Sequence, residues 1–549
     1  MSESTLNIKL NKKVKVYIAS FFLMLPILFQ LLLISNSRMF VSDITRWAEL
    51  KLSILMLYVC WLLVSLGFIF LSKVRLVYLS LPIFISLIVA AYILVTGENI
   101  EYEIYASINN TTLSEAFEFA FSSFFLLPFT LVCIIFLIIY YFILNEKTDK
   151  ENKYFVSYKY SVGFLFVGAA GLLLSYQYYR DAFYKTYPLS IPFYQKMYFK
   201  ESFLFNKHYK SINYSFSGTL ELDESNDEVY IIVIGETARK HSMSVYGYPV
   251  NTTPELGSAL HDKKLKSAVY NSTSAGISTR LDIPLLISTA DTIDFKTMSS
   301  APTLAHVFNH VGFSTSLISN QEKLGRNNDT ITLMLSTMQN REYISGDADV
   351  RQYDIKLLPS LRKTINSSKG KQFIVMHLMG SHWDYSKRYP KEFDIYKNGR
   401  VGTYDNSIRY TDYVLGKILE FVKSSKKPIT LMYTSDHGEN LNDTGDGNYL
   451  HAAKEMTEYE VMVPFFLTFN ETFYNLKKDK VDRALKNRII NVSHDNVSHT
   501  LLGLAGIYDE NVYRPRKDLS STDFDFTVRR AVNRRLEIVD VDKYLQKIK

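Results

Sequence analysis

Acidic residues and histidines follow several apolar segments of this chain, and their types suit a metal site. Residues 229–234 are followed by Glu236, and residues 429–434 are followed by Asp436 and His437. Three further histidines belong to the same set, His377, His382 and His451. Carboxylate and imidazole together form a normal ligand set for zinc, whereas manganese and magnesium suit the histidines less well. A single histidine in a loop is more often structural, but the repeated pattern predicts a zinc site.

A second stretch, residues 271–288 (NSTSAGISTRLDIPLLIS), offers hydroxyl groups beside a predicted helix start. Pro284 is best tolerated in the first turn of a helix, so the helix is expected to begin near Ser278 and Thr279. Free backbone N–H groups at a helix start attract anions such as phosphate. A hydroxyl there serves either as a helix cap or as a nucleophile, and metal binding would activate it. On this chemistry Ser274, Ser278 and Thr279 remain equivalent candidates.

Alternating strand and helix patterns are expected to position these residues. The predicted strands are residues 229–234, 314–318, 372–378, 429–434 and 463–469, and residues 303–310 and 404–422 have helical spacing. The alternation indicates a doubly wound α/β sheet with helices on both faces, in which ligands bind beyond the carboxyl ends of the strands. Glu236 alone would equally suit a helix cap, so its interpretation as a ligand depends on its distant partners.

The N-terminal third of the 549 residues is apolar and aromatic, and it predicts a membrane part. Five stretches are long enough to cross a bilayer, which takes about 20 residues per helix. They are residues 16–35, 53–72, 77–96, 123–144 and 160–179. Lysines and arginines precede the first stretch and lie between the second and third and between the fourth and fifth, whereas residues 97–122 carry none. The positive-inside rule therefore puts the N-terminus in the cytoplasm and everything after the fifth span outside it.

Three parts follow from this division: a five-helix transmembrane domain at 1–180, an interfacial connector at 181–227 and a soluble domain at 228–549. The connector is rich in tyrosine and lysine, which suits the headgroup zone, although a flexible tether is the alternative. The formal charge of +7 is modest and gives no reason to expect a nucleic-acid partner. The cysteines, Cys60 and Cys133, lie in apolar runs, so the soluble domain contains no disulfide.

The acidic loop at 97–122 carries a further candidate pair. Thr111 and Glu115 are four residues apart, so on a helix they would share one face, which would suit a polar surface turned toward the soluble domain. An ordinary solvated loop is the simpler alternative.

Several motifs in fixed order resemble those of the bacterial phosphoethanolamine transferases that modify lipopolysaccharide, which include the polymyxin-resistance enzymes. These motifs are VIGETARKHSMSVYGYPVNTTP, SAGISTRLDIP, HLMGSHWDYSKRYP, YDNSIRYTD and YTSDHGENL. That family lies within the alkaline phosphatase and sulfatase superfamily. The resemblance implies an α/β/α sulfatase-like catalytic domain, and its five-span membrane part matches the N-terminal third.

The resemblance also implies roles for individual residues. Glu236, Thr279, Asp436 and His437 become ligands of a catalytic zinc ion, with Thr279 as the nucleophile. His382 and His451 would bind a second zinc ion or the substrate phosphate, and would handle a proton or hold the acceptor. The implied substrate contacts are Asn320, Lys323, His377, Thr111 and Glu115. Many relatives have cysteines where this chain has Ala275 and Leu285, so we expect packing to hold the nucleophile turn here.

The implied reaction transfers phosphoethanolamine from phosphatidylethanolamine to lipopolysaccharide, at lipid A or core, through a covalent phosphothreonine. We expect a monomeric enzyme of the bacterial inner membrane with its catalytic domain in the periplasm. Alternatives are transfer to periplasmic glucan, a phosphoglycerol transferase, a sulfatase or phosphodiesterase that uses water, and an inactive binding module. A formylglycine-type sulfatase is disfavoured because the nucleophile turn lacks the Cys/Ser-x-Pro-x-Arg signature.

Overall fold

The computed structural model describes part of the chain and divides it into two compact units, residues 1–200 and 201–549. The described residues are 102–110, 130, 131, 134, 162–163, 165–173, 190–222, 227–321, 330–344, 352–367, 369–443, 445, 449–453, 455–525 and 528–548. The predicted spans at 16–35, 53–72 and 77–96 lie outside these ranges, as do most of the spans at 123–144 and 160–179. Among the described helices, none combines the length and the apolar character that a membrane crossing requires.

Among the described parts of the first unit, two helices have defined bounds. Helix α4 (Tyr102–Asn110) lies in the predicted acidic loop, and helix α9 (Ile191–Lys210) lies in the predicted connector. The rings of Tyr102 and Tyr105 in α4 lie 5.9 and 5.7 Å from that of Tyr194 in α9. The segment predicted to be a connector is therefore partly helical.

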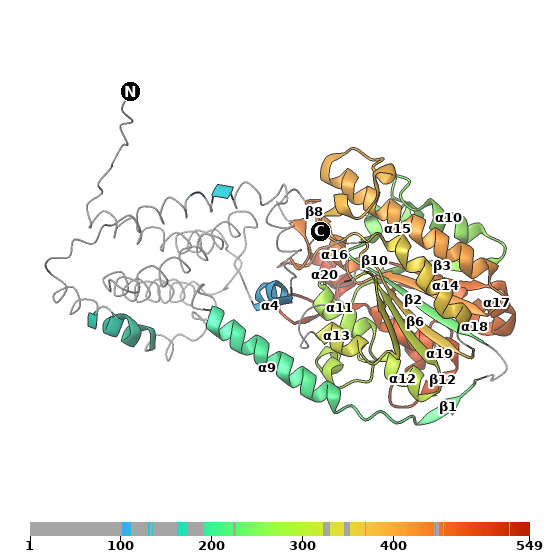
Figure 1. Cartoon of the computed structure of the whole chain (residues 1–549), viewed down its shortest axis with the longest axis horizontal. Coiled ribbons are helices and arrows are strands. Elements are labelled where there is room, and N and C mark those ends of the chain that lie inside the picture. The colour runs from blue at the N-terminus through green and yellow to red at the C-terminus, as the bar shows by residue number, and fades with distance from the viewer. Residues whose placement is uncertain are drawn as a thin grey trace. The chain divides into compact units, whose positions relative to one another are not determined.

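The second unit is built on an eight-stranded sheet with the order β11-β3-β10-β7-β2-β6-β4-β5. Figure 1 labels four of these strands, β2, β3, β6 and β10. The strands are β2 (Val229–Gly235), β3 (Leu265–Thr273), β4 (Ser314–Ser319), β5 (Asn340–Tyr343), β6 (Gln372–His377), β7 (Ile429–Ser435), β10 (Met462–Asn470) and β11 (Val492–Ser493). Strand β10 is antiparallel to both β3 and β7, whereas β2 is parallel to β6 and β7. The predicted strands are all present, and β3, β5 and β11 are additional.

Alternate side chains of β2 enter two separate hydrophobic cores, which explains why its sequence is apolar throughout. Tyr230, Ile232 and Ile234 belong to one core, and Val229, Ile231 and Val233 belong to the other. The first core is covered by α11 (Thr279–Leu286), α12 (Leu304–His310), α13 (Thr330–Leu335), α17 (Glu471–Leu476), α18 (Lys478–Lys486) and α19 (Val497–Ala505). The second is covered by α10 (Pro254–His261), α14 (Leu357–Ser367) and α15 (Gly399–Ser424), so helices cover both faces (Figure 1). The predicted α/β/α architecture is thus confirmed.

Short elements complete the unit around this sheet. Two-stranded pairs join β1 (Gly218–Leu220) to β12 (Ile507–Asp509), β8 (Asn440–Leu441) to β9 (Tyr449–Leu450), and β13 (Arg530–Val532) to β14 (Ile538–Asp540). Helices α16 (Glu458–Val461) and α20 (Val541–Ile548) are the remaining α-helices in the described ranges of the second unit. Because β3 and β7 are both antiparallel to β10, the carboxyl ends of β2, β3, β6 and β7 lie at one edge of the sheet. That edge carries the candidate site.

Candidate metal and phosphoryl-transfer site

Glu236 lies directly beyond β2, where the backbone is held in an unusual conformation. The next residue, Thr237, has a φ of 52°, which is rare for a β-branched residue, and its N–H donates to Asp436 Oδ1 at 3.0 Å. Gly380 from the HLMGSH motif packs against Glu236, since a Cβ at Gly380 would lie 2.7 Å from Glu236 N. Only glycine fits at this position, so the motif fixes the backbone of Glu236 from the neighbouring strand end.

Asp436 and His437 follow β7, the strand next to β2 in the sheet. The Nδ1 of His437 lies 2.8 Å from the carbonyl oxygen of Gly438 and must donate to it, which leaves the lone pair on Nε2. That Nε2 lies 3.3 Å from Asp436 Oδ2 and 3.8 Å from Glu236 Oε1. The backbone carbonyl thus selects the tautomer in which Nε2 is free to bind a metal.

Thr279 begins α11, after the turn that follows β3, and Ser278 is its N-cap. The helix starts where the sequence predicts, but Pro284 is its sixth residue and lies in the second turn, so the expectation of a first-turn proline was wrong. The proline is accommodated there, in a helix of eight residues. The hydroxyl of Ser274 is buried and bonds to the backbone carbonyl of Gly276, so the geometry favours Thr279 among the three hydroxyl candidates.

The Thr279 hydroxyl lies at the centre of the site. Its Oγ1 is 2.8 Å from Asp436 Oδ2, 3.1 Å from His437 Nε2 and 3.2 Å from Glu236 Oε1. The ligand atoms of Glu236, Asp436 and His437 all lie within 4.8 Å of one another, and all three residues are buried. One threonine, two carboxylates and one imidazole therefore converge from the ends of β2, β3 and β7.

This donor set fits a divalent cation. Two carboxylates and the Nε2 lone pair face one another, and no lysine or arginine of the described residues forms an ion pair with Glu236 or Asp436. Burial and the charge of Asp436 raise the pKa of Glu236 well above its usual value. Burial also lowers the pKa of His437 to about 4, so its imidazole is neutral at pH 7. Like charges held together in this way are stabilised by a bound cation, and oxygen with imidazole is a set that zinc accepts.

His451 lies beside the cluster, next to a buried carboxylate that sequence reasoning missed. The rings of His437 and His451 have centroids 4.1 Å apart, and His451 Nδ1 lies 3.5 Å from Glu439 Oε1. Glu439 is fully buried. Burial alone would lower the pKa of His451, but the Glu439 carboxylate outweighs it and raises that pKa. His382 is half-buried, and its Nδ1 lies 2.7 Å from the Trp383 carbonyl oxygen.

The remaining predicted site residues lie farther from the cluster or outside the described ranges. His377 is the last residue of β6; it is buried, and burial lowers its pKa to about 4. The Asn320 amide donates to Gln352 O and Asp354 Oδ1, both at 2.7 Å, inside the domain. Lys323, Thr111 and Glu115 fall among the residues that are not described.

Two further residues at the site had only weak signals in the sequence. Glu439 follows His437 by two residues within YTSDHGENL, and only the fold shows that its carboxylate points into the interior. Gln321 donates to the Leu378 carbonyl at 2.8 Å and lies 3.5 Å from Glu236 Oε2. An amide side chain in a loop carries no chemical signature in the sequence, so only the contact with Glu236 in the structure identifies Gln321 as part of the site.

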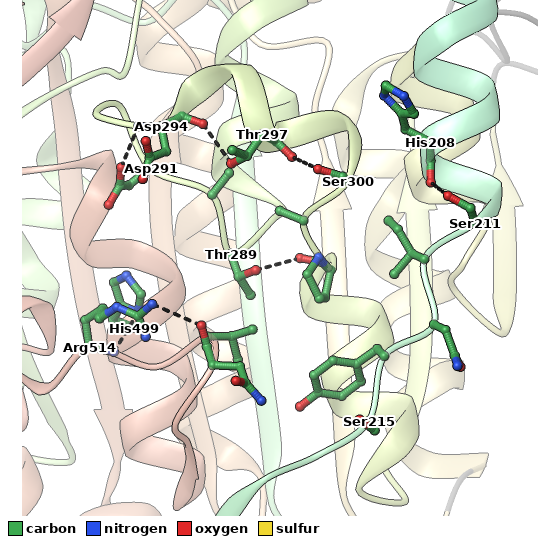
Figure 2. Close-up of a pocket in the computed structure, with 18 residues that line it drawn as sticks. His208, Ser211, Ser215, Thr289, Asp291, Asp294, Thr297, Ser300, His499 and Arg514 are labelled. Carbon is green, nitrogen blue, oxygen red and sulfur yellow. Dashed lines mark hydrogen bonds between the residues drawn. The ribbon is translucent and has the colours of Figure 1, made fainter.

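A separate cavity of about 600 Å³ lies elsewhere in the second unit and contains none of the predicted site residues. Figure 2 shows its lining, which includes His208, Thr289, Thr297 and Arg514. Several hydroxyls there already donate to backbone carbonyls, such as Thr289 to Pro302 and Thr297 to Asp294 (Figure 2). Its segment 289–302 follows α11, whereas Thr279 begins that helix, so the cavity is distinct from the candidate site.

Comparison with known proteins agrees with the fold. The sulfatase family matches residues 228–507, and the chain belongs to this family. The phosphoethanolamine transferase EptA of Helicobacter pylori is 28% identical over 312 residues, which cover 53% of this chain and 56% of EptA. EptC of Escherichia coli strain K12, also named a phosphoethanolamine transferase, is 26% identical over 328 residues, or 56% of each chain. The chain therefore spans about half the length of the curated relatives that it matches.

Two solved structures share the fold. The integral membrane protein lipooligosaccharide phosphoethanolamine transferase A of Neisseria meningitidis has a TM-score of 0.66 at 18% identity, covering 92% of this chain and 98% of its own. The periplasmic domain of Escherichia coli EptC, solved in complex with Zn, has a TM-score of 0.53 at 24% identity and covers 60% of this chain and 97% of its own. The resemblance to phosphoethanolamine transferases that the motifs indicate is confirmed by these matches.

Proposed function

We propose that this protein is an enzyme that transfers phosphoethanolamine from phosphatidylethanolamine to lipopolysaccharide, at lipid A or core, through a covalent intermediate on Thr279. The single observation that carries the proposal is the position of the Thr279 hydroxyl, 2.8–3.2 Å from Asp436, His437 and Glu236. The sequence relatives named phosphoethanolamine transferases support the choice of the transferred group.

Glu236, Asp436 and His437 would hold a zinc ion with Thr279 as the fourth ligand. The Zn complex of the similar EptC domain supports this choice of metal. A zinc ion bound there would lower the pKa of the Thr279 hydroxyl and offset negative charge on the phosphate oxygens. The neutral imidazole of His437 and the two carboxylates give that ion a partly neutralised, buried environment.

The chain's own residues account for positioning and proton movement in both half-reactions. Asp436 Oδ2 accepts a hydrogen bond from the Thr279 hydroxyl at 2.8 Å and so fixes the position of Oγ1 within the site. In the first step Oγ1 gives up its proton and bonds to phosphorus, the bond from phosphorus to the diacylglycerol oxygen breaks, and that oxygen takes up a proton. In the second, an acceptor oxygen gives up its proton and bonds to phosphorus, the bond from phosphorus to Oγ1 breaks, and Oγ1 takes up a proton.

His451 is the best candidate to transfer these protons. Its pKa is raised by Glu439, so it holds a proton more readily than the neighbouring His437 and can return it to a leaving oxygen. His382 is expected to contact the phosphate or the acceptor. Asn320, Lys323, His377, Thr111 and Glu115 stay proposed substrate contacts.

The N-terminal third is proposed to form the five-span membrane domain, with the catalytic domain in the periplasm. The neisserial integral membrane protein, which this chain matches over 92% of its length, supports that arrangement. Both lipid substrates would then meet the enzyme at the membrane surface. Each transferred ethanolamine adds an ammonium group to the outer surface and weakens its attraction for cationic peptides such as polymyxin.

Intact-protein mass spectrometry of the purified full chain, incubated with phosphatidylethanolamine in micelles, tests the proposal. The wild type should gain one phosphoethanolamine group on Thr279, Thr279→Ala should gain none, and Ser278→Ala should behave as the wild type. An adduct on another residue would refute the nucleophile. Absence of any adduct from the wild type, with free phosphoethanolamine released instead, would favour a hydrolase.

A further inference from the structure

A buried carboxylate lies under the turn that carries Thr279. Asp282 Oδ1 accepts the backbone N–H of Gly276 at 2.6 Å, and Oδ2 accepts that of Ser278 at 3.0 Å. The side chain has no exposed surface. The N–H groups of the turn that leads into α11, at Gly276 and at the N-cap residue Ser278, are therefore bound by the protein's own carboxylate.

No cation neutralises Asp282 among the described residues. The nearest basic side chain is His494, whose Nδ1 lies 3.9 Å from Oδ1. That Nδ1 accepts the N–H of Ala275 at 3.2 Å, so the imidazole is neutral, and burial lowers its pKa to about 4. Burying a carboxyl group without a salt bridge costs free energy. The hydrogen bonds from the backbone N–H groups of the turn offset this cost for Asp282.

His494 extends the same network toward the metal site. Its Nε2 lies 3.1 Å from Thr434 Oγ1, and Thr434 lies two residues before Asp436 in the chain. The turn is also held by Val532 N, which donates to the Ala275 carbonyl at 2.7 Å. Asp282 and His494 thus connect the backbone of residues 275–278 to the strand end that supplies two of the proposed ligands.

Hydrophobic packing supports the turn but does not determine how its peptide groups are oriented. Ala275 and Leu285 share one small cluster with Leu281, Phe295 and Val532, which confirms that packing fills the position where many relatives have cysteines. Apolar contacts are not directional, whereas two short hydrogen bonds to one carboxylate determine the orientation of the peptide groups just before Thr279.

We propose that Asp282 is a positioning residue that aims the Thr279 hydroxyl at its target by clamping the two N–H groups that precede it. The inference rests on the proposed function, because it assigns Asp282 to the first half-reaction of Thr279. Asp282 is buried and reaches no substrate, so its loss should slow formation of the covalent adduct. The concentration of lipid donor that gives half of the maximal single-turnover rate should stay unchanged. Misplacement of a reacting atom by about 1 Å can cost up to about 100-fold in rate.

Asp412 provides a matched control for this clamp. It is also buried, and its carboxylate accepts the N–H groups of Glu255 and Leu256, at 2.8 and 3.0 Å, at the start of α10. Asp282→Asn and Asp412→Asn each replace one carboxylate oxygen by an NH₂ group, which cannot accept the second N–H. Both changes should lower the melting temperature, but only Asp282→Asn should slow the chemistry.

The experiment measures, on the full-length protein, the single-turnover rate of adduct formation, the melting temperature and the metal content. Asp282→Asn is expected to keep the metal and to lose 10- to 100-fold in the single-turnover rate of adduct formation and in kcat. This magnitude is the cost expected when a nucleophile is displaced by about 1 Å. Asp282→Ser, which removes the buried carboxyl group and retains a small acceptor, should show the same loss and protects the test if the asparagine variant does not fold.

The outcomes separate the two claims. If the wild type forms no adduct on Thr279, the proposed function fails. If the wild type forms it and a folded Asp282 variant forms it equally fast, only the positioning role is overturned. A loss of rate in Asp412→Asn equal to that in Asp282→Asn would also overturn it, because the effect would then be one of general stability.

Discussion

Replacing Glu236 by glutamine is expected to have opposite effects on the metal-free and the metal-loaded protein. The ligand atoms of Glu236, Asp436 and His437 lie within 4.8 Å of one another. Two unit charges at that separation repel by about 3 kcal/mol at an effective dielectric constant of about 20. Glutamine removes this repulsion when no metal is bound, so metal-free Glu236→Gln should be more stable than the metal-free wild type by up to that amount.

When the metal is bound, the wild type should be more stable than Glu236→Gln, because glutamine replaces a charged ligand by a weaker neutral one. The gain in the metal-free state should also grow with pH. Below the raised pKa of Glu236 its carboxyl takes up a proton and the repulsion is already relieved.

Melting temperatures of the full chain, measured with zinc and with a chelator at pH 6 and pH 8, test both points. Zinc should raise the melting temperature of the wild type more than that of Glu236→Gln, and the chelator should reverse their order. A conservative Glu236→Asp variant, which keeps the charge but shortens the side chain, should not gain stability in chelator. If metal-free Glu236→Gln melts below the metal-free wild type, or binds zinc equally tightly, Glu236 does not share one cation with Asp436.

Three further predictions address the surroundings of the site. Gly380→Ala should lower both the melting temperature and zinc occupancy, because its Cβ would lie 2.7 Å from Glu236 N and its φ is +54°; normal zinc content in a folded variant would contradict the packing argument. Burial raises the pKa of Glu460 to about 7. The stability that its protonated carboxyl contributes is therefore complete below the unfolded pKa and is lost as the pH rises through 7. Glu460→Gln should flatten the fall in melting temperature from pH 5 to pH 8, and an unchanged slope would count against this argument. Deletion of residues 1–180 should leave a folded, zinc-binding domain with poor activity on bilayer donors, since every proposed zinc ligand lies after residue 235; full activity on bilayers would refute the role of the membrane part.

The central strands and their chemical residues were predictable because burial leaves a clear trace in sequence. β2, β6 and β7 are buried along their whole length, so each is a continuous apolar run that ends at polar residues. β3 was missed because polar residues interrupt its apolar pattern and several of its side chains are only partly buried. The antiparallel direction of β10 also left no trace, since direction depends on the connections between strands.

The residues that support the site were harder to predict than its proposed ligands. Asp282 and Glu439 lie within motifs that were singled out, yet nothing in their spacing shows that both carboxylates are buried. Gln321 and His494 act through contacts with residues distant in the chain. Pro284 illustrates the limit of a local rule, because packing of α11 in the core tolerates a proline one turn later than its propensity favours.

The most direct test of the account is a crystal structure of the zinc-loaded protein with anomalous diffraction recorded at the zinc edge. The account predicts a zinc peak about 2.0–2.2 Å from oxygen and nitrogen ligands of Glu236, Thr279, Asp436 and His437. A zinc ion bound elsewhere, or Glu236 directed away from Asp436 and His437 in the loaded protein, would contradict it.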